Sequence, residues 1–397
     1  MPAADRLAMS QPVLTGRERD FVLAALGSGW IAAGPQITAF EDELARVTGS
    51  PYVVACVNGT AALHISLLLA GVRPGDLVIV PTITFIATVT TVRYCSAEPV
   101  FLGSDDDLNL DPLLLERFLT EECERDVGGT LVERGSGRRI AAIVPVHVFG
   151  NPCDPQVFAV AEAFGVTVVE DAAESLGSSW TAGPLAGRST GTIGMAGVLS
   201  FNGNKVITTG GGGAMLFADE GLAERARYLI NQAKDDSVRF LHNEVGYNYR
   251  FSNIHAAIGL AQLEALPSVL EAKRANFETY RAGFEGVAGV RLLGVPEGTS
   301  PNYWFYSLFV DEAPNGPGRD AVLKALDADG IESRPLWYPN HMQKPFSAFR
   351  AYGVERSVHY WRHILNIPCS ADLTPEQVER VIDGVRRACG ADAQKES

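Results

Sequence analysis

Three separate stretches of the sequence contain residue types that could bind a small anionic ligand and react with it. Lys205 is the single lysine in "LSFNGNKVITTGGGGAML", shortly before a run of glycines. A lysine amine attacks carbonyl groups when its surroundings keep it neutral or easily deprotonated. Asp171 ends an apolar run in "VVEDAAES", where a ligand of an open α/β sheet would bind. Thr60 lies in "NGTAAL", at a predicted strand-to-helix turn whose backbone N–H groups suit a phosphate.

Each stretch alone also has an ordinary explanation. Asp171 could cap a helix, and most lysines are simply solvated. "NGTAAL" lacks both the Walker lysine spacing and a GxGxxG fingerprint, which argues against a nucleotide loop. Together with Phe85 in "PTITFIAT", however, the stretches supply what pyridoxal phosphate needs. These are a lysine for its aldehyde, a carboxylate for its pyridine nitrogen, a phosphate cradle and a stacking ring.

The pattern of apolar segments predicts the elements that would position these residues. Short runs such as "YVVAC", "DLVIVP", "PVFL", "IAAIV" and "VTVVE" alternate with helical segments. This alternation predicts an α/β domain with a mostly parallel sheet. A long helical segment is expected from about Leu263, and mixed strands and helices follow it. We expect a large α/β domain over 1–270, with an N-terminal helical segment, and a smaller α+β domain over 271–397. The polar segment 120–139 is expected to be a surface insertion.

Composition excludes several classes of function. The formal net charge is −14, from 47 acidic residues against 33 Lys plus Arg, which argues against nucleic-acid binding. No apolar window is long enough for a membrane span, and the N-terminus does not resemble a signal peptide. The six cysteines form no CxxC pair and the histidines show no metal spacing. We therefore expect a cytoplasmic protein with no metal site, no membrane partner and no nucleic-acid partner.

Five segments together resemble the DegT/StrS family of nucleotide-sugar aminotransferases. They are "NGTAAL", "PTITFIAT", "EDAAESLGS", "SFNGNKVITTGGGGA" and "GYNYRFSNIHAAIG", and the similarity runs from about Ala24 to Val381. The resemblance implies the aspartate-aminotransferase fold (fold type I), with a large domain built on a mostly parallel, seven-stranded type of sheet. It also implies pyridoxal phosphate as cofactor, with pyridoxamine phosphate as its intermediate form, and a homodimer with shared active sites.

The same resemblance assigns expected roles to individual residues. Lys205 would bond to the cofactor aldehyde and move protons, Asp171 would pair with the pyridine nitrogen, and Phe85 would stack on the ring. Glu174 would lie near the phenolic oxygen, where its carboxyl must be protonated or share a proton. The other expected cofactor-binding residues are Gly59, Thr60, Ala61, Ser200, Asn202 and, from the neighbouring subunit, Asn248. Expected substrate-binding residues are Trp30, Tyr249, Arg250, Arg334 and His341, the last two in "GIESRPLWYPNHMQKPF".

The implied reaction moves the amino group of L-glutamate to the 4-keto carbon of a nucleotide-linked 4-keto-6-deoxyhexose, giving a 4-amino sugar for surface glycan synthesis. A UDP-linked 2-acetamido sugar is the first expectation for the acceptor. GDP-4-keto-6-deoxymannose, the acceptor of perosamine synthases, is the alternative. Sugar 3-dehydratases of this family have histidine in place of Lys205, so a transaminase is expected here. A non-catalytic sensor of the same fold, which binds the cofactor, is the alternative from another functional class.

Overall fold

A mostly parallel sheet forms the centre of the molecule, as predicted. The computed structural model describes residues 6–236, 238–312 and 316–390. Within them the largest sheet has eight strands. Only β10 runs antiparallel to its neighbours, and all other pairs are parallel. In spatial order the strands are β1 (Tyr52–Cys56), β10 (Gly213–Phe217), β9 (Ala196–Ser200), β7 (Thr167–Asp171), β6 (Ile140–Ile143), β2 (Leu77–Pro81), β3 (Glu98–Leu102) and the two-residue β15 (Ala351–Tyr352).

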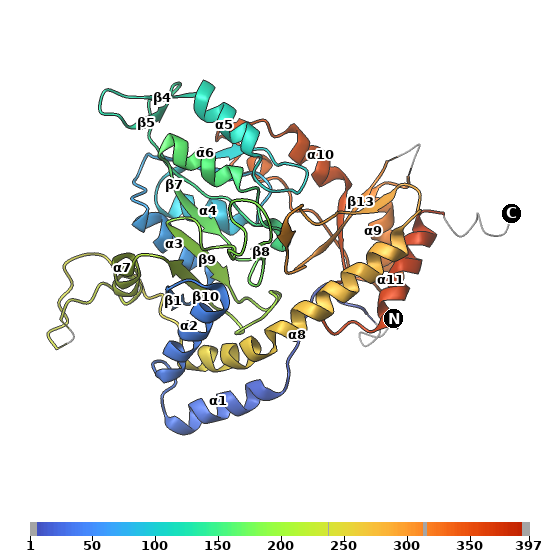
Figure 1. Cartoon of the computed structure of the whole chain (residues 1–397), viewed down its shortest axis with the longest axis horizontal. Helices are drawn as coiled ribbons and strands as arrows, with labels where there is room; N and C mark the ends of the chain where they lie inside the picture. The colour runs from blue at the N-terminus through green and yellow to red at the C-terminus, as the bar shows by residue number, and fades with distance from the viewer. Residues whose placement is uncertain (1–5, 237, 313–315, 391–397) are drawn as a thin grey trace.

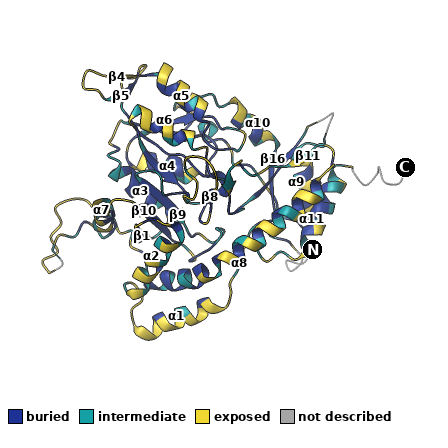
Figure 2. Ribbon diagram, viewed as in Figure 1, coloured by how far each residue is buried: buried dark blue, intermediate teal, exposed yellow. Residues whose placement is uncertain are grey.

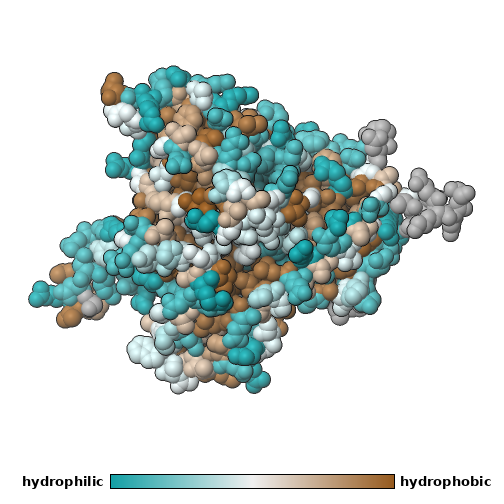
Figure 3. All heavy atoms as spheres, in the orientation of Figure 1, coloured by the Kyte–Doolittle hydropathy of each residue, from teal (hydrophilic) through white to brown (hydrophobic). Residues whose placement is uncertain are grey.

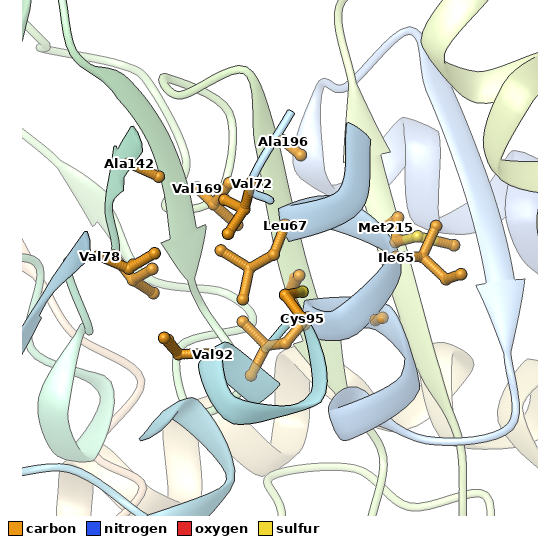
Figure 4. Packing of buried hydrophobic residues seen from close by; sticks show 14 of the residues in the cluster. Ile65, Leu67, Val72, Val78, Val92, Cys95, Ala142, Val169, Ala196 and Met215 are labelled. Carbon is orange, nitrogen blue, oxygen red and sulfur yellow. The ribbon is translucent and has the colours of Figure 1, made fainter. Parts of the chain in front are cut away.

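Helices cover both faces of this sheet, which explains why its strands carry apolar residues on both faces. Along β2, Val78 and Val80 belong to one hydrophobic core, whereas Leu77 and Ile79 belong to another. The first core is formed with α3 (Gly59–Leu69), α4 (Ile86–Tyr94) and α7 (Glu220–Ile230). In Figure 4, Leu67 of α3 and Val92 of α4 lie against strand residues of this core. The second core is formed with α5 (Pro112–Glu121) and α6 (Gln156–Phe164).

One long helix, α8 (Asn253–Phe284), crosses the molecule from the large sheet to the second domain (Figure 1). It begins ten residues earlier than the sequence suggested, because the Ser252 side chain caps it by accepting the His255 N–H. Its first half packs into the core of the large domain through Leu263 and Leu266. Its second half packs into a separate core through Phe277 and Tyr280. The helices α1 (Arg17–Ser28) and α2 (Pro35–Thr48) pack along its first half.

The core of the small domain is built on an antiparallel sheet, in the order β11 (Val290–Leu292), β13 (Tyr306–Val310), β16 (Ile364–Ile367) and β14 (Arg334–Pro335). The helices α9 (Arg319–Ala328) and α11 (Pro375–Ala388) pack on it, and α10 (Glu355–His363) precedes β16. The chain crosses between the two cores more than once. Leu7 pairs with Ile331 in the small domain, while β15 returns to the large sheet. The short strands β8 (Ser179–Trp180) and β12 (Thr299–Ser300) also pair across the two parts.

The segment 120–139 contains a small hairpin of β4 (Cys123–Arg125) and β5 (Leu131–Glu133) at the surface (Figure 2). Its turn is exposed, while Cys123 and Leu131 are buried against the core of α5 and α6. Two single-turn 3-10 helices, Val148–Gly150 and Asn340–Met342, complete the elements used below. Across the described parts of the chain, no helix combines the length and apolar character that a bilayer crossing requires.

Candidate active site

A cavity of about 700 Å³ opens where β7, β9 and the start of α3 meet, and Lys205 points into it. Parallel strands commonly place ligand sites beyond their carboxyl ends, and β7 ends here at Asp171. The structure brings nine of the predicted residues together around this cavity. They are Gly59, Thr60, Phe85, Asp171, Glu174, Ser200, Asn202, Lys205 and Arg334.

The glycines after Lys205 mainly allow neighbouring segments of the chain to pack closely. Lys205 lies in the connection from β9 to β10, two strands that the sequence did not reveal. Gly210 has a positive φ of 80°, which favours glycine. A Cβ at Gly213 would lie 2.5 Å from the backbone carbon of Asn58, and one at Gly212 would lie 2.8 Å from the Phe251 ring. The run therefore lets β10 approach the start of α3, while Gly211 and Gly212 also line the cavity.

The Lys205 amine lies between a carboxylate and an aromatic ring. Its Nζ is 3.8 Å from Glu174 Oε1 and 3.8 Å from the centroid of the Trp304 ring. Burial lowers the pKa of Lys205, although the nearby charges of Glu174 and Asp171 act in the opposite direction. An amine that loses its proton more easily is a better nucleophile and a better proton acceptor.

Glu174 is fixed by backbone groups. Its Oε2 accepts the N–H of Phe149 at 2.9 Å, and its own carbonyl accepts a hydrogen bond from the Asn302 side chain at 2.8 Å. Phe149 has a φ of 57°, a strained value for a residue with a side chain. Burial raises the pKa of Glu174 to about 7, with the Lys205 charge opposing the shift. This carboxyl can therefore hold or release a proton near neutral pH.

Asp171 is buried and lines the cavity, and each oxygen of its carboxylate accepts one hydrogen bond. Oδ2 accepts the Thr88 hydroxyl at 2.7 Å, and Oδ1 accepts the Ala173 N–H at 3.1 Å. Burial raises the pKa of Asp171, so a cationic N–H placed here would stabilise its charged form. Thr88 was not among the predicted residues. The sequence could have indicated Thr88, because it follows Phe85 by one helical turn in "PTITFIAT" and so lies on the same side of the helix.

The start of α3 forms a recess suited to an anion. Asn58 caps the helix, because its Oδ1 accepts the Ala61 N–H at 2.8 Å. The Ala61 amide is thus already engaged and Ala61 does not line the cavity, whereas Gly59 and Thr60 do. A Cβ at Gly59 would lie only 3.0 Å from the Ser200 Cβ, so the absence of a side chain brings the serine close to the helix start. Helix N-termini attract anions through their dipole and free N–H groups.

Besides Ala61, five predicted residues lie outside this cavity. Asn248 and Arg250 are exposed next to the end of β1, where the Tyr249 carbonyl accepts the Val57 N–H at 2.9 Å. Trp30 is 62% exposed, and its carbonyl accepts a hydrogen bond from Asn253. His341 does not line the cavity, and its Nδ1 lies 2.6 Å from the Thr82 hydroxyl oxygen. Their expected roles toward the substrate and the neighbouring subunit stay predictions.

The cavity also has an aromatic wall, most of which sequence reasoning missed. Trp304, Phe305, Trp337 and Tyr338 line it, and the rings of Trp304 and Phe305 stack at 3.9 Å. The aromatic-rich stretches "NYWFYS" and "PLWYPN" could have indicated this wall. Aromatic residues next to strands, however, more often belong to a hydrophobic core than to a binding site.

The donor set fits pyridoxal phosphate. An easily deprotonated amine suits an aldehyde, a buried carboxylate suits a protonated pyridine nitrogen, and the start of α3 with Ser200 suits a phosphate. Phe85 is 54% exposed and lines the same cavity, so its face is free for a planar ring.

Comparison with known proteins gives the same picture. Residues 12–386 match the sequence model of the DegT/DnrJ/EryC1/StrS aminotransferase family. The chain is 36% identical to the GDP-perosamine synthase of Caulobacter vibrioides, over 95% of this chain and 96% of that protein. It is 33% identical to the GDP-perosamine synthase of Escherichia coli O157:H7, over 94% and 96%. The crystal structure of the aminotransferase TlmJ from Streptoalloteichus hindustanus superposes with a TM-score of 0.86, at 29% identity over 97% and 99% of the two chains.

Proposed function

Because the chain belongs to the DegT/DnrJ/EryC1/StrS aminotransferase family and is a pyridoxal phosphate-dependent sugar aminotransferase, we propose that it aminates the 4-keto carbon of a nucleotide-linked 4-keto-6-deoxyhexose. L-Glutamate is the proposed amino donor. One observation carries the proposal, namely that Lys205, Asp171 and Glu174 face one another inside a single cavity at the strand ends. A non-catalytic sensor would not need a buried amine whose pKa is lowered in this way.

When bound, pyridoxal phosphate supplies an electron sink for the carbon that gains or loses the amino group. The residues of this chain supply the rest. Asp171 would stabilise a positive charge on the pyridine nitrogen, Phe85 would cover the ring, and Thr60 and Ser200 with the start of α3 would hold the phosphate. Lys205 takes a proton from one carbon and returns it to another, and its place on one side of the cavity sets the stereochemistry.

Glu174 keeps the proton balance at this site. Its pKa of about 7 lets it stay protonated beside an oxygen anion or share the Lys205 proton. The backbone N–H of Phe149 fixes the carboxyl in either state. The residue therefore adjusts charge without having to move.

For the acceptor, we rank GDP-4-keto-6-deoxymannose ahead of a UDP-linked 2-acetamido sugar. The two relatives described above are named GDP-perosamine synthases, and they align over nearly the full chain. This reverses the order that the sequence segments alone suggested. Arg334 at the edge of the cavity, held by an ion pair with Glu332, suits the diphosphate through its planar fork of donors.

A homodimer with shared active sites is part of the proposal. Large apolar side chains are exposed on α1, just after its end, and in the loop after α7. In Figure 3, brown side chains gather above α1 and near the end of the loop that projects to the left. A second copy would cover such side chains and place Asn248 of one copy near the cavity of the other. Among these exposed side chains are Leu23, Leu26, Trp30, Val238, Phe240 and Val245.

A half-reaction followed by visible absorbance tests the function. The holoenzyme is first converted to its pyridoxamine phosphate form with L-glutamate. GDP-, UDP- and dTDP-linked 4-keto-6-deoxy sugars are then offered separately. We expect the GDP-linked sugar to restore the absorbance of the aldehyde form fastest. Recovery with the UDP-linked 2-acetamido sugar alone would reverse the ranking, and recovery with none of the three would refute the acceptor class.

A further inference from the structure

The contact between Trp304 and Lys205 has no place in the function proposed so far. The Trp304 side chain is buried, and its ring centroid lies 3.8 Å from the Lys205 Nζ. Glu174 approaches the same amine at 3.8 Å. An ammonium over an indole face is stabilised by the ring quadrupole, most strongly where water is excluded. The carboxylate and the ring thus form two sides of a single binding place for the charged amine.

A hydrogen bond links the Trp304 ring to the backbone next to Lys205. Its indole N–H donates to the carbonyl of Asn204, the residue directly before Lys205, at 2.6 Å. The Trp304 backbone N–H donates to Asn302 Oδ1 at 3.0 Å. On the other side, the buried Lys273 of α8 donates to the Trp304 carbonyl at 3.3 Å. Contacts with the loop of Lys205, with Asn302 and with α8 therefore fix the position of this ring.

We propose that Trp304 is a positioning residue, which holds the Lys205 ammonium beside Glu174 whenever this amine is not bonded to the cofactor. The proposal rests on the proposed function, in which the lysine is released and must then transfer protons. A released lysine side chain is otherwise free to adopt many rotamers. Held between the ring and the carboxylate, the amine stays within reach of the reacting carbon.

The contact has a definite electrostatic sign. The indole face favours the ammonium over the neutral amine, so it raises the pKa of Lys205 against the lowering that burial causes. Removing the ring should leave Lys205 less protonated at any given pH. A ring that merely filled space would have the opposite effect, because its removal would admit water and leave Lys205 more protonated.

The test measures the titration of Lys205 in the cofactor-free protein, without any sugar. The chain has only six lysines, so ¹³C reductive methylation gives few NMR signals, and a Lys205→Arg variant assigns the one of interest. In Trp304→Leu we expect the ratio of ammonium to amine on Lys205 to fall about five-fold, equivalent to about 1 kcal/mol. Trp304→Phe, which keeps a weaker aromatic face, should give a smaller fall.

Trp337→Leu is the matched control: Trp337 lines the same cavity and its ring lies 6.5 Å from that of Trp304, but none of the described contacts joins it to Lys205. It should leave the Lys205 titration unchanged. An unchanged titration in Trp304→Leu, or an equal change in Trp337→Leu, would overturn the proposal. If Trp304→Leu does not fold, Trp304→Phe decides: a fall supports the proposal and no change refutes it. Because no sugar is used, failure of the acceptor assay would leave this result standing.

Discussion

The cavity has a buried floor and an exposed rim, and the two are built differently. The floor consists of Asp171, Glu174 and Lys205, which are largely buried and have hydrogen-bond or charge partners within the chain. The rim includes Phe85 and Tyr338, which are 54% and 40% exposed, and the exposed Arg334. The floor is preorganised before any ligand arrives, whereas the rim has surface left to bind one. This difference suggests that the floor determines the chemistry and the rim determines the choice of substrate.

The strongest test of this division replaces the amine of the floor. Lys205→Ala should lower turnover by about 10³-fold or more, because the proposed function assigns the proton transfer at the reacting carbons to this amine. The fold should persist, since the side chain makes no hydrogen bond that secondary structure needs. Steady-state kinetics and circular dichroism measure the two effects. Lys324→Ala on the remote helix α9 is the control, and near-normal turnover of the Lys205 variant would refute its role.

The next largest effect is expected at the carboxylate of the floor. Asp171→Asn keeps the shape but removes the negative charge that a protonated pyridine nitrogen needs. We expect kcat to fall by about 10²-fold with little change in the KM for the sugar. Asp219→Asn, a helix cap far from the cavity, serves as control. A rise in the sugar KM without loss of kcat would assign Asp171 to recognition instead.

The rim should respond in the opposite way. Arg334→Lys keeps the positive charge but loses the planar fork, so the KM for the nucleotide sugar should rise about ten-fold while kcat changes little. Arg46→Lys is the control. Arg46 is exposed, and among the described contacts its one ion pair is with the neighbouring Glu43. If the variant instead lost kcat equally in both half-reactions, Arg334 would contribute to the chemistry and not to substrate recognition.

The smallest expected effect concerns pH. Because burial raises the pKa of Glu174 to about 7, this carboxyl ionises as the pH rises through neutrality. If its protonated form is the active one, the rate of the native enzyme should fall a few-fold between about pH 6 and 8. Glu174→Gln cannot ionise and should flatten this limb while keeping most of the activity at pH 6. A native-like pH profile of the variant would exclude Glu174 as the titrating group.

The floor was largely predictable from sequence because local rules place it. Asp171 ends an apolar strand, and Lys205 stands out among small residues. How the floor is held in place depends on contacts that no local pattern encodes. Glu174 is fixed by Phe149, a residue in strained backbone, and Trp304 reaches Lys205 from a hundred residues away.

The fold shows the same limit. The parallel sheet followed from the alternation of strands and helices, and the comparisons confirm the fold class. The strands β9 and β10 escaped prediction because "AGVLS" and "GAMLF" each contain Gly and Ala, residues that are depleted in strands. The start of α8 was placed too late, because the cap at Ser252 lies inside a segment that we interpreted as a ligand-binding motif.

Helix α8 has a consequence for how the protein loses its structure. Its 32 residues contribute to two hydrophobic cores, and the N-terminal Leu7 is buried in the core formed by the later part of the chain. Melting either core would fray a helix on which the other depends. The two cores should therefore denature in one shared transition, and a chain cut within α8 should yield two fragments that fold poorly apart. Heat or proteolysis would then abolish the catalytic floor and the small domain together.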